Sequence, residues 1–267
     1  MYSPGQNPRT YQQAPAGYTE NVSRHGSRSA TDEDGDTVLA LWNQAAADNE
    51  LTPPGRRFGP DVRVLEAAMS TLGHGSLSGR GKDELRATAV RLDKRLPGLF
   101  SSIAKNGEKI DVVSSGQGRA VDSGTVFTTA LTDADPALKA SLGTARTDRD
   151  LLYFHKSAGG AEYRKWLAGD ERLASTLESV TDRSATHRAA ARVLGRIFEP
   201  AFVRRVVDGE FSATDSDVTA ARAVCNLHAV APAMSEESPN GGGWDFDRHL
   251  APRDAAWFGC LSDAEDF

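Results

Sequence analysis

The chain has 267 residues, of which 39% are hydrophobic, and this is enough for one large domain or for a core domain that carries an insertion. Basic residues number 31 and acidic residues 37, so the formal charge is −6, and no lysine or arginine run is long enough to follow a phosphate backbone. We therefore do not expect nucleic acid as a partner.

Membrane and export signals are absent from the sequence pattern. No apolar run approaches the roughly eighteen residues of a membrane span. Residues 1–17 are polar and contain several prolines and glycines, which predicts an irregular N-terminal arm rather than a signal peptide. Cys225 and Cys260 lack the CxxC spacing of zinc or redox sites, so two separate buried thiols are favoured over a single disulfide.

The first elements expected in chain order lead up to a loop rich in glycine. Residues 18–23, YTENVS, form a weak strand candidate that runs directly into a turn containing arginine and histidine. A helix is expected over 37–47, after an acidic run at 32–36 that suits a helix N-terminus. A second helix is expected from 61 to 72 and, after the loop, a charged helix from 82 to 96.

The clearest strand is KIDVVSS at 109–115, followed by a glycine turn that opens into a helix with Val121, Thr125 and Leu131 near one face. Beyond Pro136 the pattern becomes helical, most plainly at 185–207 and 216–234.

Two strand–turn–helix units followed by a helical block predict an α/β domain with an α-helical insertion. We expect the first part of the core at 18–135, the mainly helical insertion at 136–245 and a return towards the core at 246–267.

The turn SRHGSRSAT at residues 23–31 carries the chemistry. A glycine turn between a strand and a helix presents backbone N–H groups to an anion, and Arg24 and Arg28 add two guanidinium forks that suit phosphate oxygens. Positive neighbours disfavour the imidazolium form, so the pKa of His25 should be depressed and the ring kept nucleophilic. These residues predict a phosphohistidine site without a metal ion, although the Arg-His-Gly triplet taken alone favours a solvated surface turn.

Three ordered blocks resemble the histidine acid phosphatase family. RHGSRSAT at 24–31 resembles its RHGxRxPT signature, with Ala30 in place of proline, and GSLSGRGKDEL at 75–85 resembles its GxLTxxGxxEL segment. SSGQGRAVDSGTVF at 114–127 resembles its second strand–helix block. A weaker C-terminal match, AWFGCLSDAED, is similar to the branch of multiple inositol polyphosphate phosphatases and bacterial phytase-like enzymes.

The resemblance implies a phosphoglycerate-mutase-like α/β core with an α-helical insertion domain. It implies a phosphomonoesterase without cofactor that acts on inositol polyphosphates such as phytate, and an extracytoplasmic location. In that family the residue matching His25 is the nucleophile. Those matching Arg24, Arg28 and Arg119 hold the phosphoryl group, and Thr31 adds a hydroxyl contact.

The second histidine motif of the family, His-Ala-Glu or His-Asp, does not appear in this sequence. In relatives it supplies the acid that protonates the leaving oxygen, so this acid is expected beyond Phe267. His228 is not a convincing substitute, because it lies on an expected helix and lacks an adjacent acid. His249 is not one either, because it lies before the block AWFGCLSDAED, and in relatives the second histidine motif follows that block. The alternatives are an incomplete or degenerate member that binds phosphate without efficient turnover, or a general acid phosphatase.

Two further features of the sequence bear on anion and metal binding. His155, Lys156, Arg164 and Lys165 could surround a polyanionic substrate, but a charged helix face is the favoured explanation. The segments GSLSGRGKD and DEDGD fail the spacing rules of the P-loop and the EF-hand, so no metal site is expected.

Overall fold

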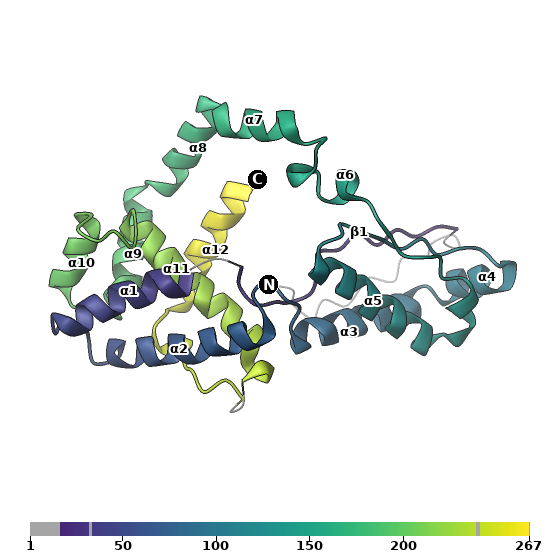
Figure 1. Cartoon of the computed structure of the whole chain (residues 1–267), viewed down its shortest axis with the longest axis horizontal. Coiled ribbons are helices and arrows are strands. Elements are labelled where there is room, and N and C mark those ends of the chain that lie inside the picture. The colour runs from purple at the N-terminus through teal and green to yellow at the C-terminus, as the bar shows by residue number, and fades with distance from the viewer. Residues whose placement is uncertain (1–16, 32–33, 239–240, 267) are drawn as a thin grey trace.

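The computed structural model describes residues 17–31, 34–238 and 241–266. Apart from Gly17, the expected N-terminal arm lies outside these residues, and so do the first two residues of the acidic run, at 32 and 33. The described helices gather in two bodies that are joined by an arch (Figure 1).

The larger body is entirely helical. It comprises α1 (Asp34–Ala47), α2 (Gly55–Leu72), α9 (Ser184–Leu194), α10 (Pro200–Val207), α11 (Asp217–Val230) and α12 (Pro252–Asp266), with the short 3-10 helices η3 (Ala231–Glu237) and η4 (Phe246–Arg248). Their buried apolar side chains form one continuous core. On α2, Phe58, Val62, Leu65 and Met69 are buried at intervals of three and four residues, so one stripe of this helix faces that core.

The smaller body holds the described strands. It comprises α3 (Gly79–Arg95), α4 (Pro97–Asn106), β1 (Val113–Ser114), α5 (Gly118–Ala134), the 3-10 helix η1 (Pro136–Ala140) and β2 (Arg146–Thr147). Helix α3 packs along α5, and Ala89, Phe100, Leu131 and Leu138 form a second, smaller core. Strands β1 and β2 pair in parallel, as the α/β class requires.

Of the two expected strands, one is confirmed in part and the other is wrong. The strand at 109–115 is confirmed for Val113 and Ser114 only, with Ile110 making one further bridge to Leu142. The strand expected at 18–23 is wrong: residues 18–26 have no regular secondary structure. A strand exists only when a neighbouring strand pairs with it, and no described segment pairs with these residues.

The expected helices at 37–47, 61–72 and 82–96 are confirmed as α1, α2 and α3, each beginning earlier than expected. The expected helix at 185–207 is two helices, since the chain turns after α9 and restarts with Pro200 at the first position of α10. The expected face of α5 is right for Leu131, which is buried, and wrong for Val121 and Thr125, which are exposed.

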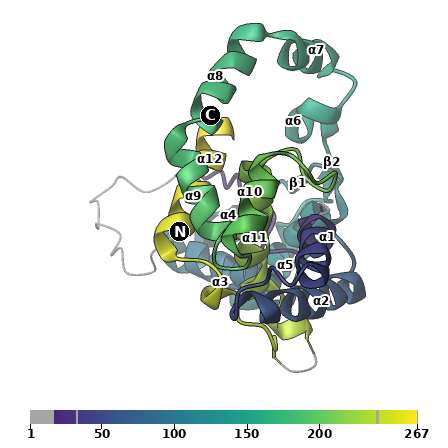
Figure 2. The same ribbon diagram turned by 90° about the vertical axis from the view of Figure 1, so that its left-hand side faces the viewer.

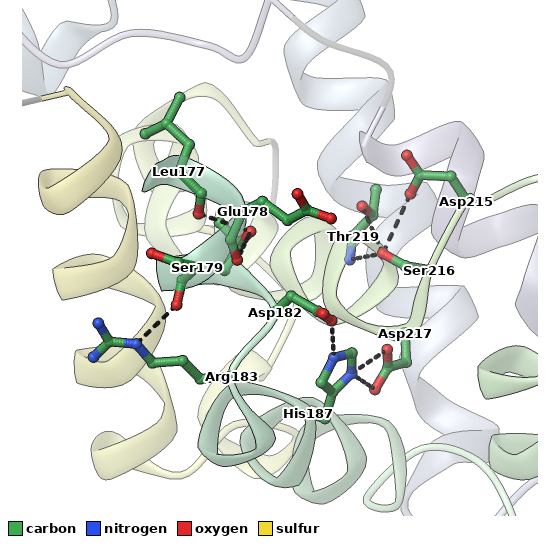
Figure 3. Close-up of polar contacts among 11 residues, drawn as sticks. Leu177, Glu178, Ser179, Asp182, Arg183, His187, Asp215, Ser216, Asp217 and Thr219 are labelled. Carbon is green, nitrogen blue, oxygen red and sulfur yellow. Dashed lines mark hydrogen bonds and ion pairs between the residues drawn. The ribbon is translucent and has the colours of Figure 1, made fainter. Parts of the chain in front are cut away.

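An arch of short helices links the two bodies (Figures 1 and 2). It comprises α6 (Arg149–Leu152), the 3-10 helix η2 (Phe154–Lys156), α7 (Ala161–Gly169) and α8 (Glu171–Thr181), and none of these helices has a buried residue. At its base, His187 of α9 lies between Asp182 and Asp217 (Figure 3). The domain boundary expected at 135/136 stays a prediction. Helices α1 and α2 share one hydrophobic core with α9, α10 and α11.

Two smaller expectations concern the cysteines and the membrane. Cys225 is buried on α11 and Cys260 is exposed on α12. Both are free thiols, so the expectation of two separate thiols rather than a disulfide is confirmed, but only Cys225 is buried as expected. None of the helices in the described ranges is both long and apolar enough to cross a membrane.

Candidate active site

The turn that carries His25 is held by the loop between α2 and α3. Backbone hydrogen bonds run from Ser29 N–H to the Ser76 carbonyl (3.1 Å), from Gly75 N–H to the Ala30 carbonyl (2.9 Å) and from Ser78 N–H to the Ser27 carbonyl (3.0 Å). The first two of the three blocks that carry the family resemblance therefore lie side by side.

Glycine is required where this turn meets the start of α3. A Cβ atom added to Gly26 would lie 2.5 Å from the carbonyl oxygen of Gly81, and one added to Gly81 would overlap the carbonyl oxygen of Ser27. Because neither backbone can move without breaking the hydrogen bonds around it, the two glycines allow the turn and the helix to touch.

Glu84, in the second turn of α3, clamps the residue two positions after His25. Its carboxylate accepts hydrogen bonds from the Ser27 backbone N–H (3.1 Å) and from the Ser27 hydroxyl (2.8 Å). The side chain of Ser78 caps the N-terminus of α3 by accepting the Gly81 N–H (3.1 Å), and its hydroxyl donates to the Ser27 carbonyl (3.0 Å). The turn is thus fixed to α3 through Ser27.

The His25 ring is oriented by its neighbour. Its Nδ1 lies 2.8 Å from the carbonyl oxygen of Gly26, which can only accept, so Nδ1 carries the proton and Nε2 keeps a free lone pair. Burial lowers the pKa of His25, and the positive charges of Arg119, Arg28 and Arg24 lower it further. The ring is therefore neutral at neutral pH, with Nε2 available as a nucleophile.

The structure brings the predicted arginines together around His25. Arg24 and Arg28 come from the turn itself, and Arg119 comes from the first turn of α5, more than ninety residues along the chain. The Nε of Arg119 is buried and has no hydrogen-bond partner among the described residues. A buried guanidinium donor without a partner is costly unless an acceptor binds, so the site has a place for an anion.

Thr31 lies beside Arg119. A Cβ added to Gly75, whose φ is +73°, would lie 2.8 Å from Cγ2 of Thr31 and 3.6 Å from Nη1 of Arg119. Gly75 thus keeps open the space between them, and the predicted hydroxyl contact of Thr31 with a phosphoryl group stays a prediction. All five predicted site residues meet at one place, where the turn, the 73–78 loop and α5 converge.

Ser123 and Glu84 were not singled out by the sequence. The Ser123 hydroxyl accepts the Gly26 N–H at 3.3 Å and donates to the Arg119 carbonyl at 2.7 Å. Both residues stand inside the motif blocks quoted for the resemblance. Their partners are 97 and 57 residues away, so no local pattern could reveal these contacts.

The other histidines have different surroundings. His228, at the end of α11, pairs with Asp247 through Nε2 (2.8 Å). His249 is fully buried in the larger core, where it lies edge-on to Phe58 with a centroid distance of 5.1 Å, and burial lowers its pKa. Its nearest carboxylate oxygen, on Asp61, is 3.7 Å away, too far for a hydrogen bond.

The basic segment at 155–165 lies on the arch. Arg164 donates to the carbonyl oxygens of His155 (3.2 Å) and Ser157 (2.7 Å), and the exposed Lys165 lies 4.0 Å from Glu162. The guanidinium of Arg164 thus closes a local loop, and the charged-face explanation accounts for these contacts.

The family model of the histidine phosphatase superfamily (branch 2) matches residues 20–194, which is more than half of the chain. The chain therefore belongs to this superfamily, and the site at His25 lies within the matched residues. No curated protein sequence matches the chain significantly.

Solved structures of the multiple inositol polyphosphate phosphatase of Bifidobacterium longum are similar over 97% of this chain. The complex with phosphate has a TM-score of 0.87 and 24% identity, and the chain spans 65% of its length. The complex with inositol hexasulfate has a TM-score of 0.84 and 24% identity, with 66% of its length spanned. At this identity the similarity establishes the fold, an α/β core with a helical domain.

Proposed function

We propose that this chain carries the nucleophilic site of a phosphomonoesterase that works through a phosphohistidine. The observation that carries the proposal is a neutral His25, with Nε2 unprotonated, beside three arginines. One of them, Arg119, has a buried donor that no described residue accepts. Charge in the transition state of phosphoryl transfer lies on the equatorial oxygens, which guanidinium groups stabilise.

The proposed reaction has two steps. In the first, the Nε2 lone pair of His25 attacks phosphorus, a P–N bond forms, and the P–O bond to the alcohol breaks while the leaving oxygen takes a proton from solvent. In the second, a water oxygen attacks phosphorus, the P–N bond breaks and its electron pair returns to Nε2, inorganic phosphate is released, and a proton of the water passes to solvent. Nε2 starts and ends unprotonated, which fits the depressed pKa of the ring.

The substrates that we propose are inositol polyphosphates. The support is the similarity to a solved protein that is named for these substrates and was captured with phosphate and with inositol hexasulfate. Three arginines around one histidine also suit a substrate whose neighbouring phosphates add negative charge. An extracytoplasmic location rests on the family resemblance and stays a prediction.

The alternative is a protein that binds phosphate but turns it over poorly. It is favoured by the places of His228 and His249, since one pairs with Asp247 and the other is buried in the larger core. Neither residue is arranged as the acid that an inositol leaving group requires.

The nucleophile is tested by labelling. The protein is incubated with a ³²P-labelled phosphomonoester, quenched in alkali and analysed for phosphohistidine, which survives alkali but not acid. We expect label in the wild type and none in His25→Ala, because no arginine can replace the nucleophile. His155→Ala, which removes an exposed histidine of the arch, is the control and should label normally. Equal labelling of His25→Ala would refute the proposal.

The substrate class is tested with inositol hexakisphosphate beside p-nitrophenyl phosphate. A positioned general acid contributes about 10²- to 10⁴-fold for a poor leaving group and far less for nitrophenolate. Turnover of both substrates supports the proposed phosphatase. Hydrolysis of the aryl ester alone favours a general acid phosphatase or a missing acid, and phosphate binding without labelling favours the alternative.

A further inference from the structure

Ser123 occupies an unusual position in the second turn of α5. Its side chain is buried, and its one oxygen joins two parts of the site: it accepts the backbone N–H of Gly26 (3.3 Å) and donates to the backbone carbonyl of Arg119 (2.7 Å). A hydroxyl has one donor and two acceptor positions, so both bonds form at the same time.

The backbone at His25 needs such an anchor. Residues 18–26 belong to no strand in the described ranges, so sheet pairing does not fix the approach to the nucleophile. From Ser27 onward the turn is held by Glu84 and by the 73–78 loop. These contacts come from α3 and its preceding loop, whereas the contact of Ser123 is made from α5, the helix that carries Arg119.

We propose that Ser123 is a positioning residue that holds His25 at a fixed distance from Arg119. The inference rests on the proposed role of His25 as nucleophile. The Ser123 hydroxyl bonds to backbone groups of Gly26 and Arg119, so it acts through the Gly26 backbone on one side and the first turn of α5 on the other. The distance matters because Nε2 and the guanidinium must meet the same phosphoryl group, one at phosphorus and one at an oxygen.

Ser123→Ala removes both contacts. A misplacement of about 1 Å at a reacting centre costs up to about 10²-fold, so we expect phosphohistidine formation to slow by about tenfold to a hundredfold. A second readout is the pKa of His25, measured by NMR titration of the ring. The charges that face this ring are Arg24 and Arg28 on its own segment and Arg119 from α5, and all three depress its pKa. If Arg119 is no longer held close, this pKa rises towards its ordinary value.

Thr125→Ala is the matched control. The Thr125 hydroxyl donates to the carbonyl of Val121 at 3.0 Å, the same bond to the residue four positions earlier on the same helix, but Thr125 is exposed and does not contact the turn. We expect its labelling rate and the His25 pKa to equal those of the wild type. Ser123→Cys keeps the volume of the side chain but hydrogen-bonds weakly, and it replaces Ser123→Ala if the alanine variant loses its cooperative melt.

The outcomes separate the two proposals. Slower labelling and a higher His25 pKa in the Ser123 variant, with Thr125→Ala unchanged, support the positioning role. If the Ser123 variant matches Thr125→Ala in both readouts, the positioning role is overturned while the nucleophile stands. If the wild type is not labelled at all, the proposed function fails, and the titration of His25 alone then decides whether Ser123 sets its distance from Arg119.

Discussion

At the scale of single residues, three histidines of this chain behave differently because their neighbours differ. His25 is surrounded by arginines and is neutral, with a depressed pKa. His187 lies between two carboxylates, which raise its pKa, and His249 is buried among apolar side chains, which lower it. The residue type alone fixes none of these states, because desolvation and nearby charge decide which form is favoured.

Arg119→Ala should weaken the binding of inorganic phosphate or vanadate by about tenfold to a hundredfold. A charge-assisted hydrogen bond contributes about 1.5–3 kcal/mol, and the buried Nε of Arg119 has no other described partner to compensate. Titration calorimetry on the folded variants measures the effect. The control is Arg95→Ala, which removes an exposed arginine from the end of α3 and should leave the affinity unchanged. An equal loss in both variants would mean that Arg119 does not contact the phosphate bound beside His25.

At the scale of elements, the site depends on how closely α3 approaches the His25 turn. The backbones touch at Gly26, Ser27 and Gly81. The side chains of Ser78 and Glu84 stabilise this contact by hydrogen bonds to the Ser27 backbone. Helix α5 is fastened to the same turn through Ser123. The turn thus joins two helices that pack along each other to His25, the proposed nucleophile.

Gly81→Ala should destabilise the protein by roughly 1–3 kcal/mol, because the new Cβ overlaps the Ser27 carbonyl and the helix must move away. Gly98→Ala is a matched control in α4, where an added Cβ meets nothing within 4 Å. Alanine there should be neutral or stabilising by up to about 1 kcal/mol. Urea denaturation measures both variants, and a Gly81→Ala protein as stable as Gly98→Ala would contradict the close contact.

At the scale of the whole molecule, the arch meets the larger body at a clasp formed by Asp182, His187 and Asp217 (Figure 3). Nε2 of His187 lies 2.7 Å from Asp182, at the end of α8, and Nδ1 lies 2.9 Å from the buried Asp217, at the start of α11. Carboxylates only accept hydrogen bonds, so both contacts are satisfied only when both ring nitrogens carry protons. The clasp therefore requires the imidazolium form.

His187→Gln should remove stability that depends on pH. The pKa of His187 is raised in the folded protein, first by Asp182 and then by Asp217. Its contribution is therefore complete below the ordinary pKa of about 6.5 and is lost as the pH rises through the folded-state pKa. Because the ring is 39% exposed, screening by water limits the effect to about 1 kcal/mol.

Melting temperatures from pH 5.5 to 9 provide the measurement. The gap between wild type and His187→Gln should be widest at the acidic end and should close towards pH 9. His155→Gln, which changes an exposed histidine of the arch, should run parallel to the wild type throughout. A gap that stays constant or widens with rising pH would show that His187 does not act as a charged clasp.

Local sequence patterns were sufficient to predict three of the helices and the electrostatic environment of His25. The 3.6-residue spacing of apolar side chains defines α1, α2 and α3, because the stripe that a helix buries is set locally. Arg24, His25 and Arg28 are neighbours in the chain, so their mutual effect on the pKa of His25 could be predicted without a fold. The motif blocks added Arg119 and Thr31, and the structure brings both to the same turn.

Contacts between segments that are far apart in the sequence determine how these residues are held. Glu84 and Ser123 are fixed by partners far away in sequence, and the close approach of Gly26 to Gly81 exists only once α3 has packed. The expected strand at 18–23 failed because a strand depends on a neighbour that its own sequence does not contain. Likewise, the pKa values of His187 and His249 depend on burial and on carboxylates from other segments of the chain. Local patterns specify periodicity and charge, whereas contacts between distant segments arise from packing, and packing positions the site.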